Sequence, residues 1–296
     1  MIKFLLNANF IYLNVNCLTH FFSHMSIYFA SLNSGSNGNC YYVGNDEEAV
    51  FIDAGLSCKE TEKRMKMLGI SMKKIKAIFI SHEHIDHVKG VEVLAKKYEL
   101  PVYISPQTKE NCRTPIPTTL IQNLAANSTT QIGNLAIKSF SKFHDAKDPC
   151  SFVITSGSCQ VGVFTDIGHV CENVSTHFQD CNAVFLEANY DEEMLEKGPY
   201  PFHLKKRISS DVGHLSNKQA MELFVQHRTP KLSHLLLSHL SKENNSPELA
   251  AHYFNTHSTH TEIIVASRYK PTEIYSIHPL DVKNKTINQS KQLQLF

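Results

Sequence analysis

Short runs of apolar residues, separated by polar turns, recur along the chain from residue 27 onwards. Such runs, rich in Ile, Val, Phe and Leu, are typical of buried β-strands. They predict strands at 27–32, 40–43, 49–52, 75–80, 101–105, 135–143, 151–155, 160–165, 183–186, 232–238 and, as the last one, 262–266. Longer segments predict helices at 57–68, 88–98, 217–227 and 247–257. Ser216 or Asn217 can cap the third helix, because short polar side chains accept hydrogen bonds from free N–H groups there.

The order of these elements indicates a single α/β (α+β) domain. Hairpin-like strands come first and strands then alternate with helices, which fits two sheets with helices on their outer faces. No repeat or linker divides the chain, so we expect one domain over residues 25–296. Segment 106–134 carries three prolines and many polar residues, and we expect it to be irregular with one short helix. We expect the polar tail from about residue 283 to be loose.

Residues 1–24 differ from the rest of the chain. Their apolar residues are interrupted by asparagines, and Lys3 is their one lysine. Met25 directly precedes the first clear strand, so we interpret Met25 as the natural start and residues 1–24 as an N-terminal extension outside the fold. An export signal is the alternative, but no cleavage pattern of small residues follows. The segment is too short and too polar to span a membrane.

Composition and charge narrow the class of protein. Apolar residues make up 42% and charged residues 19% of the chain, as in an ordinary globular protein. A formal net charge of +1 provides no overall attraction for nucleic acid, although a local patch such as Lys205, Lys206 and Arg207 would suffice. The eight cysteines are scattered and form no CxxC pair. This favours reduced thiols and a cytoplasmic location over a disulfide framework.

The strongest chemical signal is the segment Ser81-His82-Glu83-His84-Ile85-Asp86-His87, directly after the predicted strand 75–80. Neutral imidazole and carboxylate oxygen are the preferred ligands of several divalent transition metals. A turn at the end of a buried strand holds such side chains rigidly, so the segment predicts a metal site. His144, Asp166 and His239 also follow predicted strands, and strand ends at one edge of a sheet can converge on it.

The candidate metal ligands are His82, His84, Asp86, His87, His144, Asp166 and His239. One ion needs three or four protein ligands, so this set predicts two divalent ions bridged by a carboxylate and a water. All donors are nitrogen or oxygen, which permits zinc, manganese or iron. Taken alone, each residue is also compatible with a polar surface turn or a cap. Asp53, after strand 49–52, can orient the ligand turn from behind or simply close a turn.

The motif and its companions resemble a known family. The histidine-rich segment 81–87, with His, Asp and His at later strand ends, is similar to the motif series of the metallo-β-lactamase superfamily. Further segments look like its YycJ/WalJ branch: Ser31–Cys40, His144–Pro149, Thr165–Gly168, Glu187–Asp191, Gly213–Asn217 and Leu237–Asn245. The resemblance covers roughly residues 26–270 and supports Met25 as the start.

The resemblance implies a four-layer αββα sandwich with two metal ions, zinc or manganese, and it assigns the ligands. His82, His84 and His144 would hold one ion. Asp86, His87 and His239 would hold the other, and Asp166 would bridge them. The implied activity is metal-assisted phosphodiester hydrolysis by a 5′-to-3′ exonuclease on double-stranded DNA. The expected partner is therefore nucleic acid, with DNA favoured over RNA.

Further residues of these motifs receive roles by the same resemblance. Asp86 and His214 are the expected catalytic residues. His214 would stabilise the transition state or protonate the leaving oxygen, and a capping or core histidine is the alternative. The expected substrate contacts are Ser34, Ser36, Asn39, Asn189 and Asn244.

Other functions compete with this interpretation. An RNase Z-like RNA phosphodiesterase would use the same metals and an auxiliary histidine. A small-molecule hydrolase of thioesters or lactones would also use the same metals. Segment 167–238 is too short for the large insert of a β-CASP ribonuclease. A non-enzymatic scaffold with a structural metal is disfavoured by the complete ligand set. The sequence makes no prediction of the oligomeric state.

Overall fold

A computed structural model of the protein describes residues 26–258 and 260–279, and the statements below concern this part of the chain. The predicted N-terminal extension, residues 1–24, and the predicted loose tail lie outside the described residues. The domain boundaries 25 and 296 therefore stay predictions.

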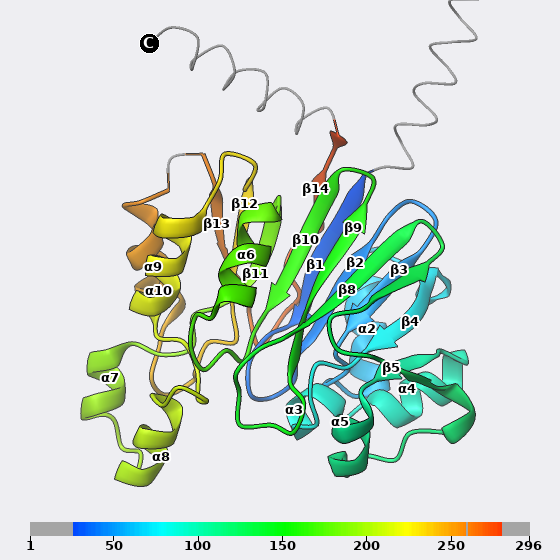
Figure 1. Ribbon diagram of the computed structural model, residues 1–296, viewed down its shortest axis with the longest axis horizontal. Coiled ribbons are helices and arrows are strands. Elements are labelled where there is room, and N and C mark those ends of the chain that lie inside the picture. Colours follow the sequence, from blue (N-terminus) through cyan, green and yellow to red (C-terminus); the bar gives the residue numbers. More distant parts are fainter. Residues whose placement is uncertain (1–25, 259, 280–296) are drawn as a thin grey trace, which may run out of the picture.

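Two seven-stranded β-sheets lie face to face at the centre of the molecule, and helices cover their outer faces (Figure 1). In the first sheet the order is β14-β1-β2-β3-β4-β5-β6, and in the second it is β13-β12-β11-β10-β9-β8-β7. The first sheet contains β1 (Ile27–Asn33), β2 (Cys40–Gly44), β3 (Ala49–Ile52), β4 (Ile75–Phe79), β5 (Val102–Ile104), β6 (Ile121–Asn123) and β14 (Tyr275–Ile277). The second contains β7 (Thr129–Ile132), β8 (Leu135–Ser141), β9 (Cys150–Ser156), β10 (Cys159–Phe164), β11 (Ala183–Glu187), β12 (His234–Ser238) and β13 (Glu262–Val265). The predicted αββα sandwich is confirmed.

The space between the sheets is filled by large apolar side chains from both. The Phe185 ring of β11 lies 4.9 Å from Tyr41 of β2 and 6.0 Å from Phe29 of β1, measured between ring centroids. All three side chains are fully buried. Strand β11 pairs in parallel with both β10 and β12 and is buried on both faces. This explains its continuous apolar run, because a central parallel strand has no solvent face.

Two groups of helices cover the outer faces of the sheets. The first sheet carries α2 (Cys58–Met67) and α4 (Val91–Tyr98), and the second carries α6 (Glu172–Asp180), α9 (Asn217–His227) and α10 (Pro247–Asn255). As predicted, Ser216 caps α9: its hydroxyl accepts from the Gln219 N–H, and the Gln219 side chain accepts from the Ser216 N–H. The remaining α-helices lie along the lower edge in Figure 1: α3 (Ile85–Val88), α5 (Pro106–Asn111), α7 (Glu192–Lys197) and α8 (Phe202–Ile208).

The short strands at the sheet edges were not predicted from the pattern of apolar residues. Segment 106–134 holds β6 and β7 as well as the expected helix, and β14 follows the strand that was predicted to be last. Each lies at the edge of a sheet and has only three or four residues. Strand β14 pairs with β1, from the other end of the chain. Such strands are held by backbone hydrogen bonds to a distant partner, which leave no periodic signal in their own sequence.

One predicted helix also has wrong boundaries. The helix expected over residues 88–98 is divided into α3 and α4 around Gly90, whose N–H donates to the Ala54 carbonyl at 2.8 Å. A Cβ atom at this position would lie 1.7 Å from the Leu56 carbonyl oxygen. Glycine therefore lets the helices pack against the loop after β3. Helix α6 was not predicted.

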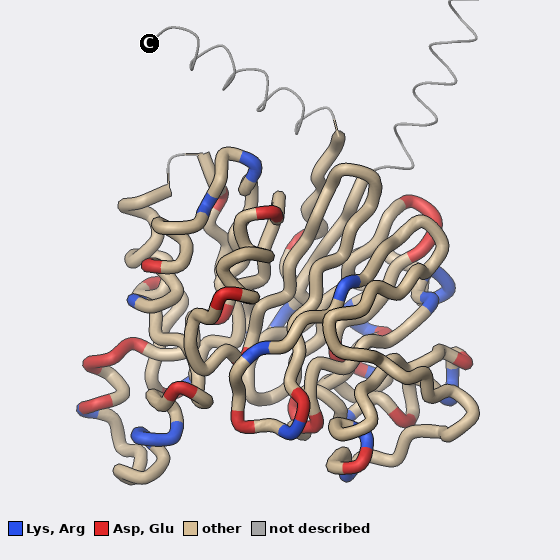
Figure 2. The backbone as a smooth tube through the Cα atoms, viewed as in Figure 1, with Lys and Arg blue, Asp and Glu red and all other residues tan. Residues whose placement is uncertain are grey.

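Basic and acidic residues are interspersed along the backbone of the described part of the chain (Figure 2). This agrees with the net charge of +1. No helix among residues 26–258 and 260–279 combines the length and the apolar character needed to cross a membrane.

Candidate metal centre

The histidine-rich segment lies where β4 leaves the first sheet. His82 is fully buried and His84 stands at the N-cap of α3. Asp86 and His87 belong to α3 itself, so the predicted turn is in part a short helix. The helix turns Asp86 and His87 toward the second sheet, while His82 and His84 remain on the loop before it.

The ring nitrogens of His82, His84 and His144 form the first group. His84 Nδ1 lies 3.1 Å from His82 Nε2 and 3.3 Å from His144 Nε2. His144 comes from the loop after β8, and its Nδ1 lies 3.0 Å from the Gly213 carbonyl oxygen. That contact makes Nδ1 the protonated nitrogen and leaves Nε2 as a donor atom for a cation.

Asp86, His87 and His239 form the second group. Asp86 Oδ2 lies 3.5 Å from the Nε2 atom of both His87 and His239. Asp166, after β10, lies between the two groups: its Oδ2 is 3.3 Å from His87 Nε2 and its Oδ1 is 3.9 Å from His144 Nε2. The structure therefore brings all seven predicted ligands together.

A divalent cation fits this donor set. His239 Nε2 and Asp166 Oδ2 are buried and have no hydrogen-bond partner among the described residues. Leaving such atoms without a partner costs about 1–3 kcal/mol each. A cation between them would remove that cost, and imidazole nitrogen with carboxylate oxygen suits zinc or manganese.

The backbone is strained at three of these strand ends. Asp53, Asp166 and His239 have φ angles of 62°, 55° and 56°, in the left-handed region that residues other than glycine rarely adopt. Each directly follows a strand or lies one residue beyond it: β3, β10 and β12. The left-handed turn redirects the chain at the rim of the sheet. Strain of this kind is typical of functional sites, where the surrounding structure holds it.

Asp53 holds the histidine-rich segment 81–87 in place, which is one of the two roles that the sequence predicted for it. Its Oδ1 accepts from the Ser81 N–H at 2.8 Å, and its Oδ2 accepts from the Ser81 hydroxyl at 2.9 Å. Oδ2 also lies 2.7 Å from His87 Nδ1. A carboxylate there fixes the ring orientation of His87 and directs its Nε2 toward the centre.

Glu187, the last residue of β11, is one of the residues at the site that the sequence reasoning missed. Its Oε1 lies 2.8 Å from His214 Nδ1 and 2.9 Å from His239 Nδ1. Its Oε2 accepts from the backbone N–H groups of Ile167 and Leu215. The side chain is fully buried. The signal that could have identified Glu187 is its position directly after the apolar run 183–186.

Burial and charge set the protonation states of the histidines in opposite directions. Burial lowers the pKa of His82 well below its usual range and that of His144 to about 4, so both are neutral. Burial also acts to lower the pKa of His87 and His239, but the carboxylate of Asp166 and its acidic neighbours outweigh it. The pKa of His87 is raised well above its usual range, and that of His239 to about 10. A bound cation would displace those protons, because ligand nitrogens must be deprotonated.

The carboxylates of Asp166 and Glu187 are ionised. Burial acts to raise their pKa values, but the histidines His239 and His87 hold the pKa of Asp166 well below its usual range. In the same way His214 and His239 lower the pKa of Glu187 to about 2. The site therefore presents negative charge to a cation at neutral pH.

His214 lies at the rim of the centre, between the two groups of ligands. Its ring centroid is 5.2 Å from that of His144 and 5.2 Å from that of His239. The side chain is 15% exposed, whereas the His239 side chain is 4% exposed. With Nδ1 held by Glu187, the Nε2 atom is the one that can reach a substrate.

The predicted substrate-binding residues divide into two kinds. Ser34, Asn39, Asn189 and Asn244 are buried, and only Ser36 is exposed. Three of the buried side chains hold ligand loops: Asn39 Nδ2 lies 3.1 Å from Asp86 Oδ2, Ser34 Oγ accepts from the His239 N–H at 2.7 Å, and Asn189 Nδ2 donates to the His239 carbonyl at 2.7 Å. Their direct contact with a substrate stays a prediction.

The basic segment on α8 has partners of its own. Arg207 donates to Asp145, the neighbour of His144. Lys205 Nζ donates to the Glu196 carbonyl at 2.6 Å. Arg207 therefore helps to hold the loop that carries His144.

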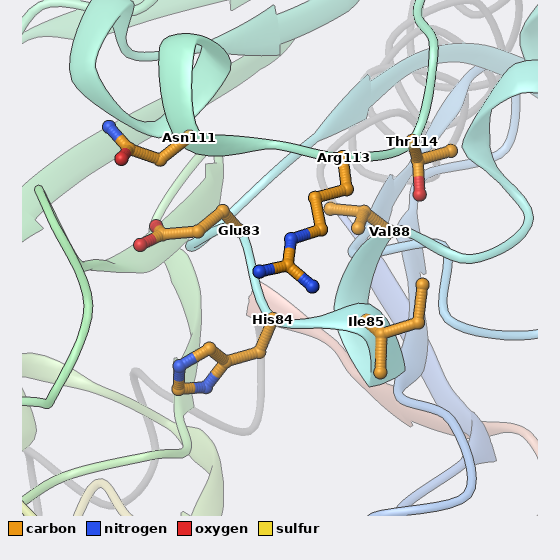
Figure 3. A pocket seen from close by; sticks show the side chains of 7 residues that line it. All are labelled: Glu83, His84, Ile85, Val88, Asn111, Arg113 and Thr114. Carbon is orange, nitrogen blue, oxygen red and sulfur yellow. The ribbon is translucent and has the colours of Figure 1, made fainter.

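A pocket of about 580 Å³ opens beside His84. Figure 3 shows the Arg113 side chain extending into it, toward His84 and between Glu83 and Ile85. Arg113 is exposed, and Ile85 is 62% exposed. The sequence did not indicate Arg113, which lies in the segment expected to be irregular. The guanidinium group of Arg113 therefore lies in a pocket that the candidate metal ligand His84 also lines.

Comparisons with known proteins agree with this fold. Residues 48–240 match the family described as "Beta-lactamase superfamily domain". Among solved structures, the metallo-β-lactamase fold protein YhfI from Bacillus subtilis superposes with a TM-score of 0.66 over 85% of this chain and 99% of its own, at 16% identity. That likeness concerns the fold alone. The fold and the site thus define a metallo-β-lactamase-fold protein.

Two curated relatives are similar over most of their length. Exodeoxyribonuclease YycJ of Bacillus anthracis is 35% identical over 88% of this chain and 98% of its own. Exodeoxyribonuclease WalJ of Streptococcus pneumoniae is 33% identical over 77% of this chain and 87% of its own. The chain therefore belongs to the metallo-β-lactamase superfamily and, within it, to the YycJ/WalJ family.

Proposed function

We propose that the protein is a metal-dependent phosphodiester hydrolase, a 5′-to-3′ exodeoxyribonuclease that acts on double-stranded DNA. The observation that carries this proposal is the similarity to the named exodeoxyribonucleases across nearly the whole of both chains. The convergence of the seven N and O donors supports the metal-dependent part of the proposal.

The proposed centre holds two divalent ions, zinc or manganese. His82, His84 and His144 would hold one, Asp86, His87 and His239 the other, and Asp166 would bridge them. Such ions supply Lewis-acid polarisation of phosphoryl oxygens and a nucleophilic water at neutral pH. The chain's part is to keep His82 and His144 neutral, to orient His87 through Asp53, and to keep solvent from the buried side of the centre.

His214 is the proposed proton donor to the leaving oxygen. Glu187 holds its Nδ1 at 2.8 Å, which fixes the tautomer and points Nε2 toward the open side. In the imidazolium form, His214 can give its Nε2 proton to the leaving oxygen or stabilise negative charge that develops there.

Arg113 is a proposed phosphate ligand. It enters a pocket that His84 also lines, and a guanidinium presents paired N–H donors that match two phosphate oxygens. Arg113→Lys keeps the charge but loses the bidentate geometry. We expect a higher KM for DNA in this variant, with little change in the hydrolysis of a small phosphodiester.

The decisive experiment is a nuclease assay with the purified protein loaded with Mn²⁺ or Zn²⁺. Duplex DNA labelled at one 5′ end should release the label first, as a mononucleotide, and label at the 3′ end should appear last. RNA hydrolysed with a much higher kcat/KM than DNA would favour the RNase Z-like alternative. Turnover of a thioester or lactone without nuclease activity would overturn the proposal. Metal analysis of the same sample identifies the ions.

Variants connect that activity to the centre. His82→Ala and Asp86→Ala should each lower kcat/KM by at least about 100-fold, because each removes a candidate ligand. His203→Ala is the matched control, since His203 is exposed on α8 and belongs to neither ligand group. Full activity of both ligand variants would refute the metal mechanism.

A cytoplasmic location fits the proposal. The cysteines among the described residues are free thiols, and Cys40, Cys150, Cys159 and Cys181 are buried. Free thiols persist where the compartment is reducing. Fusion to a fluorescent protein, followed by microscopy and cell fractionation, would test the location.

A further inference from the structure

A second pocket adjoins the metal centre on the side of His239. Its volume is about 340 Å³, and its walls come from segments 240–247 and 265–270, which follow β12 and β13. Ser34 lines the pocket and also accepts a hydrogen bond from the His239 N–H at 2.7 Å. One hydroxyl group thus lies in this pocket and touches a candidate ligand residue. Ser34 thus connects the pocket with the backbone of His239.

The lining of this pocket is basic and carries one exposed aromatic ring. Lys242, Arg268 and Lys270 line it, and none of its lining residues is acidic. Tyr269 is 72% exposed, which is unusual for a large aromatic side chain. Cations for the backbone and an aromatic face for the bases are the combination that single-stranded nucleic acids require.

The aromatic platform has a fixed backbone. The Tyr269 N–H donates to Ser267 Oγ at 3.0 Å, and its carbonyl accepts from Arg64 Nη2 at 3.3 Å. The Arg268 side chain donates from Nη2 to the Leu240 carbonyl and to Ser36 Oγ, both at 3.2 Å. The loop after β13 is therefore tied to the loop that follows His239. A rigid platform loses little entropy when a base stacks on it.

Arg268 also explains the Gly-Ser loop after β1. A Cβ atom on Gly35, whose φ is +140°, would lie 2.7 Å from Arg268 Nη2. The Asn37 side chain donates to the Arg268 carbonyl at 2.9 Å. The loop therefore contacts Arg268 as well as the ligand residues. The exposed Ser36 thus contacts Arg268, which lines the basic pocket.

We propose that this pocket binds a nucleotide of a single DNA strand next to the scissile phosphate, with its base stacked on Tyr269 and its phosphates near Lys242 and Lys270. The proposal rests on the proposed nuclease function and gives that function a strand path. Stacking needs an unpaired base, so the duplex opens at its end before the strand crosses the centre. Arg268 positions Tyr269 by joining the two loops.

The test compares Tyr269→Ala with Tyr269→Phe in the metal-loaded protein. Stacking on an aromatic side chain is worth about 5-fold to 150-fold in affinity per base, so Tyr269→Ala should raise KM for DNA by that factor with kcat little changed. Tyr269→Phe keeps the ring and should retain the wild-type KM. Phe202→Ala is the matched control: Phe202 is 80% exposed on α8 and does not line this pocket.

The lysines are tested by salt dependence. Each phosphate contact on a single strand contributes about 0.7 to the slope of log affinity against log salt concentration, so Lys270→Ala should reduce that slope by this amount. Hydrolysis of bis-p-nitrophenyl phosphate should be unchanged in Phe202→Ala, because Phe202 does not line this pocket.

Two measurements separate this inference from the proposed function. Binding of a fluorescein-labelled phosphorothioate dT oligonucleotide, followed by anisotropy, requires no cleavage. If the protein cleaves DNA and Tyr269→Ala leaves both KM and this affinity unchanged, the inference is wrong and the nuclease function stands. If DNA is not cleaved, the nuclease function fails, and the oligonucleotide affinities of Tyr269→Ala and Tyr269→Phe still decide the inference. A Tyr269→Phe variant as weak as Tyr269→Ala would also overturn it.

Discussion

Glu187 joins the two histidines at the open side of the centre, so replacing it with glutamine tests how the site is held together. The carboxylate accepts four hydrogen bonds: from His214 Nδ1 and His239 Nδ1 through Oε1, and from the N–H groups of Ile167 and Leu215 through Oε2. Glutamine has one oxygen. Whichever way its amide turns, either both rings or both backbone groups lose their acceptor.

The expected effect follows from these contacts. Hydrogen bonds to a charged group contribute about 1.5–3 kcal/mol each, so losing two should lower the free energy of unfolding by about 3–6 kcal/mol. This is a large part of the stability of an ordinary domain, which is about 5–15 kcal/mol. Residues that orient a metal-ligating histidine typically contribute about 10-fold to 100-fold to metal affinity or activity. We expect a loss in that range for Glu187→Gln.

Two assays measure these effects separately. Urea denaturation in EDTA gives the stability of the metal-free protein, and competition with a chromophoric chelator gives the metal affinity. Asp191→Asn is the matched control. Its carboxylate lies close to Glu187 in sequence, and it accepts from the Met194 N–H and from the Tyr253 hydroxyl. It should cost stability and leave metal affinity unchanged. Wild-type metal affinity in Glu187→Gln would refute the assigned role of Glu187.

Three further predictions concern the metals, the ligand segment and a surface carboxylate. EDTA should lower the Tm and added Mn²⁺ or Zn²⁺ restore it, since a ligand at 100 times its Kd stabilises by about 2.7 kcal/mol; an unchanged Tm would contradict a metal site. Gly55→Ala should lower kcat/KM by at least about 10-fold, because its Cβ would lie 1.7 Å from the Asp86 carbonyl oxygen and displace the ligand segment; unchanged kinetics would contradict this packing. A hydrogen bond from Lys97 lowers the pKa of Glu62 to about 2. Glu62 then stabilises the fold above its unfolded pKa of about 4.3, and this contribution is lost as the pH falls toward 2. An NMR titration should show this pKa, with Lys97→Ala raising it.

Much of the fold could be predicted from the sequence, because many strands and helices are marked by residue patterns within their own segments. Strands β1, β3 and β11 are short apolar runs whose burial requires a packed layer on each face of their sheet. Helix α9 is preceded by Ser216 and carries Gln219 in its first turn, and these two residues form its N-terminal capping box. Edge strands such as β14 carry no such signal, because their hydrogen bonds come from a partner far away in the chain.

The metal centre likewise combines residues that the local sequence indicates with residues that only the fold brings together. Segment 81–87 indicated metal chemistry by itself, because its ligand-type side chains lie within one strand end and one turn of helix. His144, Asp166 and His239 were identified as strand-end residues, and the parallel order of β10, β11 and β12 brings two of those ends to one rim.

What the sequence determined by itself is the type of donor and the elements that carry it. The tertiary structure decided which atoms meet. Glu187 contacts His214 and His239 only because three parallel strands end side by side. Tyr269 shares a pocket with the loop after His239 only because the loops after β12 and β13 are joined through Arg268. Contacts between residues distant in the chain depend on how the sheets are assembled, and no local pattern of residues encodes them.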